Sequence, residues 1–249
     1  PEVYYGQGHP MISSPLNVLC LKEYNIKMVS HANNHTNDYG TIGLTESVDT
    51  LKSNSIAVAG VGMDYEDARA ARYLEINKKK VGLIAFTTSF NKAGIATPSN
   101  NYVQGRPGVS YLGIKPKPLL LFSKVLRLYN KRELINNRIL TFGDYKINEI
   151  DLSEIKHIVE KASRKCDLLF VSIHNHKGPQ NRTLKSIEKI SETLINKGAD
   201  NIFIHGPHVI KGIKIYKGKP IFFSLGNFFA QLYSIDRFPA DFMKSKGYD

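Results

Sequence analysis

The hydrophobic positions along this chain fall into two patterns, which together predict alternating strands and helices. Short apolar runs predict buried strands, and apolar residues spaced three or four apart predict helices with one buried face. The predicted strands span residues 26–30, 57–61, 73–76, 81–86, 138–142, 168–173, 202–204, 213–216 and 221–224. The predicted helices span residues 14–24, 41–53, 118–135, 151–162 and 184–194. Strands that alternate with helices predict an α/β layered fold.

The connections between these elements predict how the sheets are built. Residues 77–80 and 217–219 each join two neighbouring strands as a hairpin, and hairpins combined with helical crossovers predict mixed sheets. Residues 151–154, Asp-Leu-Ser-Glu, resemble a capping box that opens a helix. The polar, Gly- and Pro-rich residues 88–114 predict a long surface loop, and such loops often carry function. We expect residues 1–249 to form a single domain.

The charge and composition of the chain indicate which kinds of molecule it is expected to bind. The 249 residues include 34 basic and 22 acidic side chains, and the net charge of +12 suits an anionic partner. A composition rich in Lys, Asn and Ile, of the kind AT-rich genomes produce, gives the same charge without any such partner. No zinc-finger spacing, RNP-like aromatic pattern or basic recognition helix is present, so nucleic acid is not expected. The partners we expect are an anionic polymer or a phosphorylated small molecule.

The sequence contains no feature of a membrane span or a signal peptide. No apolar run reaches the roughly 18 residues that a spanning helix needs. The first residues, Pro-Glu-Val-Tyr-Tyr, are unlike a signal peptide, and we expect the chain to be trimmed at its N-terminus. The expected location is therefore the cell envelope or the extracellular face if a signal or anchor precedes residue 1, and the cytoplasm otherwise.

Three predicted strands lead into segments that carry histidine, which indicates a shared functional site. Residues 33–35 are Asn-Asn-His, residues 174–176 are His-Asn-His, and residues 205–208 are His-Gly-Pro-His. Ligands bind at the carboxyl ends of the strands in open α/β sheets, so these segments are expected to converge. Neutral imidazole binds Zn, Fe and Mn, and it also serves as a general acid or base near neutral pH. The pattern therefore predicts either a metal site or an acid–base site.

These segments, together with one near the C-terminus, resemble the signature of the CapA family. Its members are poly-γ-glutamate capsule biosynthesis proteins with a metallophosphatase-like domain of the calcineurin-like phosphoesterase superfamily. The matching segments are Ser-His-Ala-Asn-Asn-His-Thr-Asn-Asp-Tyr-Gly at 30–40, Val-Ser-Ile-His at 171–174, His-Gly-Pro-His-Val at 205–209 and Gly-Lys-Pro-Ile-Phe-Phe-Ser-Leu-Gly-Asn-Phe at 218–228. They follow the order of the family, and the resemblance extends from Gly8 to Tyr248.

The resemblance implies a fold, a cofactor and a reaction. The fold is a calcineurin-like four-layer α/β/β/α sandwich with two mixed sheets, whose first strand or strands would precede this chain. The resemblance implies metal ligands for one or two divalent ions (Mn, Fe or Zn), formed by Asn34, His174, His205 and His208. It makes His35 the catalytic residue, a general acid for the leaving group in metal-assisted hydrolysis of a phosphoester. The first two motifs of the superfamily supply aspartate ligands, and nothing before Gly8 matches them.

Four further residues each have a functional and a structural interpretation. His176 is expected to contact substrate or metal, or else to orient His174. Arg106, on the long loop, is predicted to clamp a phosphate or carboxylate, unless it is an ordinary exposed arginine. Asn227 is predicted to contact substrate, or else to be a turn residue. Asp38 is expected to cap a turn rather than to act as an acid–base partner.

Three functions follow from the sequence. The leading hypothesis is a CapA-like protein, linked to poly-γ-glutamate capsule or a related envelope polymer, that hydrolyses a phosphoester with bound metal. The first alternative is a non-catalytic component of capsule synthesis that binds or assembles a polyanion. The second is a metal-free acid–base enzyme, such as an epimerase, on the same fold. Turnover of a phosphoester excludes the first alternative, and its loss on metal removal excludes the second.

Overall fold

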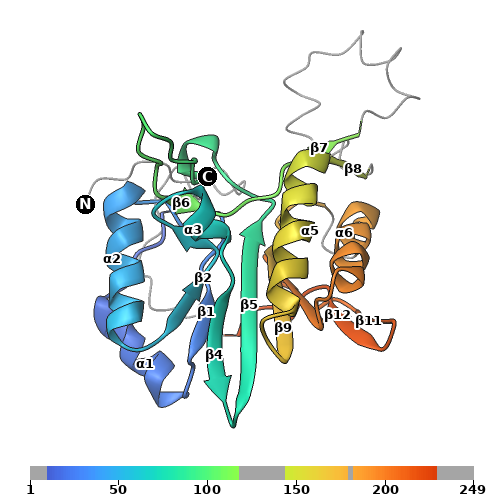
Figure 1. Ribbon diagram of the computed structural model, residues 1–249, viewed down its shortest axis with the longest axis horizontal. Helices are drawn as coiled ribbons and strands as arrows, with labels where there is room; N and C mark the ends of the chain where they lie inside the picture. The colour runs from blue at the N-terminus through green and yellow to red at the C-terminus, as the bar shows by residue number, and fades with distance from the viewer. Residues whose placement is uncertain (1–9, 118–143, 179–181, 229–249) are drawn as a thin grey trace, which may run out of the picture.

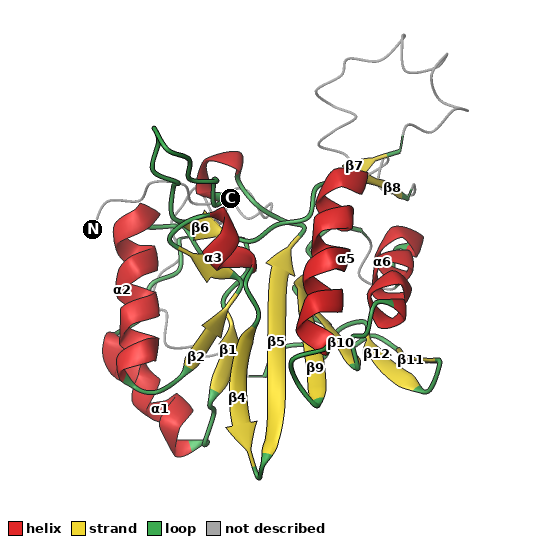
Figure 2. Ribbon diagram, viewed as in Figure 1, coloured by secondary structure: helices red, strands yellow, loops and turns green. Residues whose placement is uncertain are grey.

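A computed structural model describes residues 10–117, 144–178 and 182–228, which form a layered α/β fold (Figures 1 and 2). The first elements along the chain are η1 (Pro15–Asn17), α1 (Val18–Glu23), β1 (Met28–Ser30), α2 (Gly40–Ser53), β2 (Ala57–Ala59), β3 (Val61–Gly62), α3 (Tyr65–Arg69), β4 (Arg72–Ile76) and β5 (Lys79–Thr87). The following elements are η2 (Lys92–Gly94), β6 (Gly108–Val109), β7 (Ile114–Pro116), β8 (Tyr145–Ile147), α5 (Glu149–Ser163), β9 (Leu168–His174), α6 (Lys185–Asn196), β10 (Asn201–His205), β11 (Ile213–Tyr216) and β12 (Lys219–Phe222).

A six-stranded mixed sheet forms the centre of the fold. Its strands lie in the order β11-β12-β10-β9-β5-β4. The four inner strands, β12, β10, β9 and β5, run parallel. The edge strands β11 and β4 pair antiparallel with β12 and β5 through two hairpins. The two hairpins and the mixed sheet predicted from the sequence are therefore confirmed.

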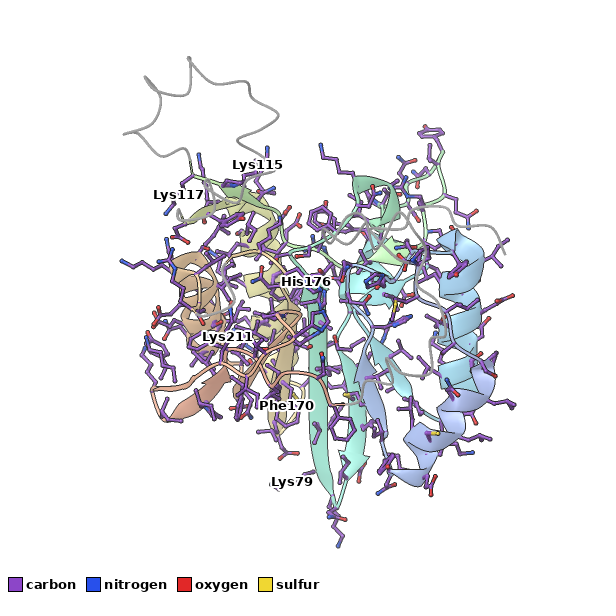
Figure 3. All side chains as sticks on the ribbon, turned by 180° about the vertical axis from the view of Figure 1, so that it is seen from behind. Lys79, Lys115, Lys117, Phe170, His176 and Lys211 are labelled. Atoms are coloured by element: carbon purple, nitrogen blue, oxygen red, sulfur yellow. The ribbon has the colours of Figure 1, made fainter. Side chains whose placement is uncertain are left out.

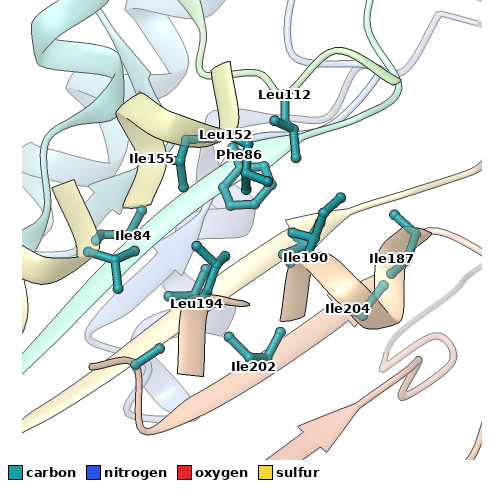
Figure 4. Close-up of a cluster of buried hydrophobic side chains, with 14 of the residues drawn as sticks. Ile84, Phe86, Leu112, Leu152, Ile155, Ile187, Ile190, Leu194, Ile202 and Ile204 are labelled. Carbon is teal, nitrogen blue, oxygen red and sulfur yellow. The ribbon is translucent and has the colours of Figure 1, made fainter. Parts of the chain in front are cut away.

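One face of this sheet packs against α5 and α6 (Figure 4). Side chains alternate along a strand, so Ile84 and Phe86 of β5 share this face, where both are almost fully buried. The buried stripe of α6 lies in the same cluster through Ile187, Ile190 and Leu194. Burial of each such side chain contributes about 1.5–3 kcal/mol, so this layer is a main source of stability.

The opposite face of the sheet packs against a second, smaller layer of strands. Leu83 and Ala85, the alternate residues of β5, lie in one hydrophobic cluster with Val58 and Ala59. Leu44 of α2 joins this cluster, and α2 covers the outer side of the small sheets (Figure 1). The layers therefore follow the order helices, small sheets, large sheet, helices. This order confirms the predicted α/β/β/α arrangement.

The second layer consists of short two-stranded sheets rather than one continuous sheet. β1 pairs parallel with β2, and β3 pairs antiparallel with β6. An open groove separates β1 from the large sheet, and Met28, Leu83 and Phe170 are among the residues that line it. Ser30 and Ser172 also line the groove, and they lie near the carboxyl ends of β1 and β9.

The N-terminus of α5 differs from the prediction. The helix begins at Glu149, because Asn148 caps it: the Asn148 side-chain oxygen accepts hydrogen bonds from the backbone N–H groups of Ile150 and Asp151. The Asp151 carboxylate accepts from the backbone N–H of Gly113 instead, at 2.8 Å, and so links the helix to the preceding loop. The capping box predicted at residues 151–154 is therefore wrong.

The segment predicted as one long surface loop also has structure of its own. Residues 88–114 contain η2 and β6, and β6 is buried where it pairs with β3. The predicted helix at 118–135 and the predicted strand at 138–142 lie outside the described residues. None of the described helices is both long enough and apolar enough to span a membrane.

The cap of α5 predicts a stability change. Asn148→Ala removes the oxygen that accepts from two N-terminal amides, so the free energy of unfolding should fall by about 1 kcal/mol. Urea denaturation measures the change. Ser153→Ala, at an exposed position of the same helix, is the matched control and should change the value by less than about 0.5 kcal/mol. Equal unfolding midpoints for the two variants would contradict the cap.

Candidate functional site

The carboxyl ends of neighbouring strands bring the predicted histidine segments together. β9 pairs parallel with both β5 and β10, and this register places His174 opposite Thr87 on one side and His205 on the other. Residues 33–35 follow β1 in the second layer, and the Asn34 side chain reaches His174 from there. The three segments therefore meet at one edge of the fold, although the roles assigned to their residues stay predictions.

A hydrogen-bonded chain of four side chains forms the centre of the site. Nε2 of His174 lies 2.8 Å from Oδ1 of Asn34, and Nδ1 of His174 lies 3.0 Å from Nδ1 of His205. Nε2 of His205 lies 3.0 Å from Oγ of Ser172. The amide oxygen only accepts, so His174 donates from Nε2 and accepts at Nδ1. His205 then donates from Nδ1, and the Ser172 hydroxyl donates to His205 Nε2.

Burial keeps both histidines of this chain neutral. The pKa of His174 is lowered to about 2, first by desolvation and then by repulsion from the neighbouring histidines. Desolvation lowers the pKa of His205 to about 4. At neutral pH both rings are therefore uncharged and carry nitrogen lone pairs, the form in which imidazole binds a metal.

Two further histidines lie beside this chain. The ring of His176 lies 4.8 Å from the ring of His174 and 5.0 Å from the ring of His208. Desolvation, with repulsion from neighbouring histidines, lowers the pKa of His176 to about 4. His208, held at a positive φ of 59° after Gly206, has its Nδ1 2.8 Å from Oδ1 of Asn227. The structure therefore brings His176, His208 and Asn227 to the predicted site.

His35 belongs to a separate pair with Asp38. Nδ1 of His35 lies 2.7 Å from Oδ2 of Asp38, and this oxygen also accepts from the backbone N–H of Met11. Asp38 is 2% exposed, whereas the His35 side chain is 32% exposed. The expectation that Asp38 caps a turn is wrong, because its carboxylate pairs with the His35 ring. A buried carboxylate that receives Nδ1–H leaves Nε2 of His35 as the atom that exchanges a proton.

Arg106 lies against its own loop. Its guanidinium donates to the backbone carbonyls of Ile95 and Lys92, and it makes no contact with the histidine segments among the described residues. These bonds stabilise the loop of residues 88–114. The substrate-clamping role of Arg106 stays a prediction, and the geometry does not favour it.

Several polar residues that position the site were not identified from the sequence. Ser172 contacts His205, and Ser89 accepts a hydrogen bond from the backbone N–H of His176. Thr88 donates to the side-chain oxygen of Asn175 at 2.7 Å, which holds the loop after β5 against the end of β9. Strand periodicity could have identified Ser172, because it lies two residues before His174 and therefore on the same face of β9.

The donor atoms of the site are of the types that bind divalent cations of borderline character. Two neutral imidazoles and an amide oxygen converge, and no lysine or arginine among the described residues forms a hydrogen bond with them. Such nitrogen-rich sets suit Zn, Fe and Mn better than Mg or Ca. Among the described residues, no group of three His, Cys, Asp or Glu side chains is arranged to hold a metal ion. The set therefore depends on Asn34 and is poor in carboxylates.

Comparison with known proteins finds capsule-related relatives. The family model described as "Bacterial capsule synthesis protein PGA_cap" matches residues 5–232. The uncharacterised protein y4sH of Sinorhizobium fredii is 32% identical over 92% of this chain and 54% of its own length. The capsule biosynthesis protein CapA of Bacillus anthracis is 26% identical over 85% of this chain and 42% of its own length. The chain thus spans about half the length of these curated relatives.

A more distant similarity is found among solved structures. A Staphylococcus aureus protein described as a 5'-nucleotidase, solved in complex with alpha-ketoglutarate, is 12% identical, with a TM-score of 0.41. The match covers 89% of this chain and 38% of that protein. Similarity at this level does not bear on the activity of the chain.

The lowered pKa values of the buried histidines predict a pH-dependent stability. An unfolded chain protonates histidine below pH 6.5, whereas folded His174 and His205 stay neutral down to much lower pH. Their contribution is therefore present above pH 6.5 and is lost as the pH falls. Between pH 7 and pH 5 each of the two rings should lower the free energy of unfolding by roughly 2 kcal/mol, measured by urea denaturation with a chelator present.

Two variants separate this effect from general acid denaturation. His205→Asn removes one buried titrating ring, so the decrease in the free energy of unfolding between pH 7 and pH 5 should become smaller. His157→Asn, at an exposed position of α5, should leave the decrease unchanged. An identical pH dependence in both variants and the unmodified chain would show that the buried histidines are not its source.

Proposed function

The chain belongs to the bacterial capsule synthesis protein family PGA_cap, and from this membership we propose that it acts on an anionic capsule or envelope polymer as a metal-dependent phosphoester hydrolase. The capsule assignment is supported by the relative from Bacillus anthracis, which is a capsule biosynthesis protein. The hydrolase assignment is carried by one observation. The Asn34–His174–His205 cluster, rich in metal-binding groups, lies next to a histidine–carboxylate pair with an accessible ring nitrogen.

The cluster would hold the cation through neutral donor atoms. The predicted ligands are Asn34, His174, His205 and His208. A divalent cation held there supplies Lewis-acid chemistry: it neutralises charge on a phosphoryl group and makes a water molecule more acidic. His176 lies between His174 and His208, where it can donate a hydrogen bond to a phosphoryl oxygen.

His35 and Asp38 supply the proton for the leaving group. Asp38 accepts from His35 Nδ1, which fixes the ring orientation and leaves Nε2 as the atom that faces the leaving group in the proposed mechanism. Nε2 of His35 then donates its proton to the leaving-group oxygen as the phosphorus–oxygen bond breaks. His35 is adjacent in sequence to Asn34, so one turn carries both the proposed proton donor and a predicted ligand.

A His35→Asn variant tests this role. It should lower kcat about 100-fold or more on glycerol phosphate, because an alkoxide leaving group needs the proton. The loss should be much smaller on p-nitrophenyl phosphate, whose leaving group departs without a proton. Zinc binding, measured by isothermal titration calorimetry, should be retained, since His35 is not among the predicted ligands.

The control is His157→Asn, an exposed histidine of α5 that should leave both rates unchanged. Chelation should abolish hydrolysis of both substrates by the unmodified protein, and added Mn²⁺ or Zn²⁺ should restore it. Hydrolysis that persists in fully demetallated protein would contradict the metal-dependent mechanism and favour metal-free acid–base chemistry.

A second candidate function is non-catalytic binding of a polyanion, and one pair of lysines favours it. Lys115 of β7 lies directly opposite Lys146 of β8 in the antiparallel register, and both side chains are exposed. Neither forms an ion pair with any other described residue. Like charges in directly opposed positions destabilise a strand pair, so an anion bound between the two would relieve this repulsion.

This candidate predicts salt-dependent binding of poly-γ-glutamate. The double substitution of Lys115→Gln and Lys146→Gln should weaken polymer binding roughly five- to tenfold, because each exposed charge contact contributes up to about 1 kcal/mol. Fluorescence anisotropy with labelled polymer at low salt measures it, and 0.5 M salt should weaken binding by the unmodified protein, since salt screens exposed charges. The matched control replaces Lys79, which lies at the opposite end of the molecule from Lys115 (Figure 3), together with its chain neighbour Lys78. Equal weakening by both double substitutions would assign the binding to net charge alone.

A further inference from the structure

We propose that Ser172 is a positioning residue that sets the tautomer and ring orientation of His205 and, through it, of His174. The Ser172 side chain is 6% exposed and lies on the face of β9 that also carries His174. Its hydroxyl oxygen lies 3.0 Å from Nε2 of His205. The consequence for metal binding rests on the proposed function, whereas the tautomer itself does not.

The position of Ser172 follows from the strand register. β9 and β10 run parallel, with Ser172 opposite Phe203 and His174 opposite His205. Ser172 therefore lies two residues before His174 on the same face of β9. The His205 ring bridges these two residues, because Nδ1 faces His174 and Nε2 faces Ser172. With serine at position 172, the His205 ring is held by two hydrogen bonds rather than one.

The chain of hydrogen bonds has fixed ends. The Asn34 amide oxygen can only accept, which orients the proton of His174 and leaves its Nδ1 as an acceptor. The hydroxyl of Ser172 can donate as well as accept. In this structure the Ser172 hydroxyl donates to Nε2 of His205. The single ring proton of His205 is therefore on Nδ1.

The same hydroxyl also suits the state in which His205 binds a metal. A metal ligand must offer a lone pair, so if His205 held a cation through Nδ1, its ring proton would have to be on Nε2. Ser172 can then accept this proton without moving, because a hydroxyl reverses its role by rotating one bond. Partners that orient a metal-binding histidine in this way typically contribute 10- to 100-fold in metal affinity.

Two substitutions of nearly equal size test the Ser172 hydroxyl, because Ser172 lies beside the groove next to β1. Ser172 lines this open groove, so one additional methyl group can be accommodated on its side chain. Ser172→Thr keeps the hydroxyl and Ser172→Val replaces it with a methyl group of nearly the same shape. Both residues favour strands, so a difference between the two variants reports the hydroxyl rather than the fold.

The experiment measures the tautomer and the metal affinity separately. Long-range ¹H–¹⁵N NMR spectra of the metal-free protein should show His205 as the single Nδ1–H tautomer in the unmodified chain and in Ser172→Thr. Ser172→Val should give a mixture of tautomers. Zinc titration calorimetry should show affinity at least about tenfold weaker in Ser172→Val than in Ser172→Thr. Ser191→Val, which replaces a buried α6 hydroxyl bonded to Ile187, is the control and should change neither measurement.

The two readouts distinguish failure of this inference from failure of the proposed function. An unchanged His205 tautomer and unchanged zinc affinity in Ser172→Val would overturn the positioning role, while zinc binding itself would still support the proposed function. An unmodified protein that binds no zinc or manganese would overturn the proposed metal site. The tautomer spectra would then decide the role of Ser172 by themselves, with a mixture in Ser172→Val supporting it and a single tautomer rejecting it.

Discussion

The parallel pairing of β9 with both β5 and β10 is the constraint on which the rest of the site depends. β9 contributes His174 at its carboxyl end, and its pairing with β10 places His205 directly opposite. A slip of one residue would move every side chain of a strand to the other face of the sheet. Ile173, which is fully buried against α5 and α6, would then exchange faces with His174. The hydrophobic core therefore fixes the positions of the histidines, because the register that buries the isoleucine is the register that joins the imidazoles.

Burial gives the histidines their chemical character. The loss of water around His174 and His205 lowers their pKa values and keeps both rings neutral. A neutral ring is a better metal ligand but a poorer proton donor at neutral pH. The proposed mechanism divides these two tasks between residues with different surroundings: the desolvated rings keep a free lone pair, and the more exposed His35 is paired with a carboxylate. Histidines in one site thus differ in chemical character because their surroundings differ.

Much of this architecture could be predicted from the sequence, whereas its finest contacts could not. Periodicity located the strands and the hairpins, and the strand ends indicated where His174 and His205 would meet. The partners of individual side chains depend on register and rotamer, which no periodic pattern encodes. Asp38 was expected to bond its own turn, and instead its carboxylate pairs with the His35 ring three residues earlier. Asn148 was missed as a cap because the Asp–Glu spacing downstream resembled one more closely.

The turn at residues 31–37 explains how one segment serves both halves of the site. Thr36 donates to the carbonyl of His31 and accepts from the backbone N–H of Asn33, and the Asn33 side chain accepts from the backbone N–H of His35. These bonds close the turn on itself, so the neighbouring Asn34 and His35 project in defined and different directions. Asn34 meets His174, whereas His35 meets Asp38.

The same turn is tied to the long loop. The Asn37 side chain donates to the carbonyl of Gly94 at 2.6 Å, and a Cβ atom at residue 94 would lie 2.9 Å from the Asn37 amide nitrogen. Glycine is therefore required there for close approach. A displacement of the loop would move the predicted proton donor and the predicted ligand together. The position of the turn, rather than either residue alone, therefore determines where the Asn34–His174 contact and the His35–Asp38 pair lie relative to each other.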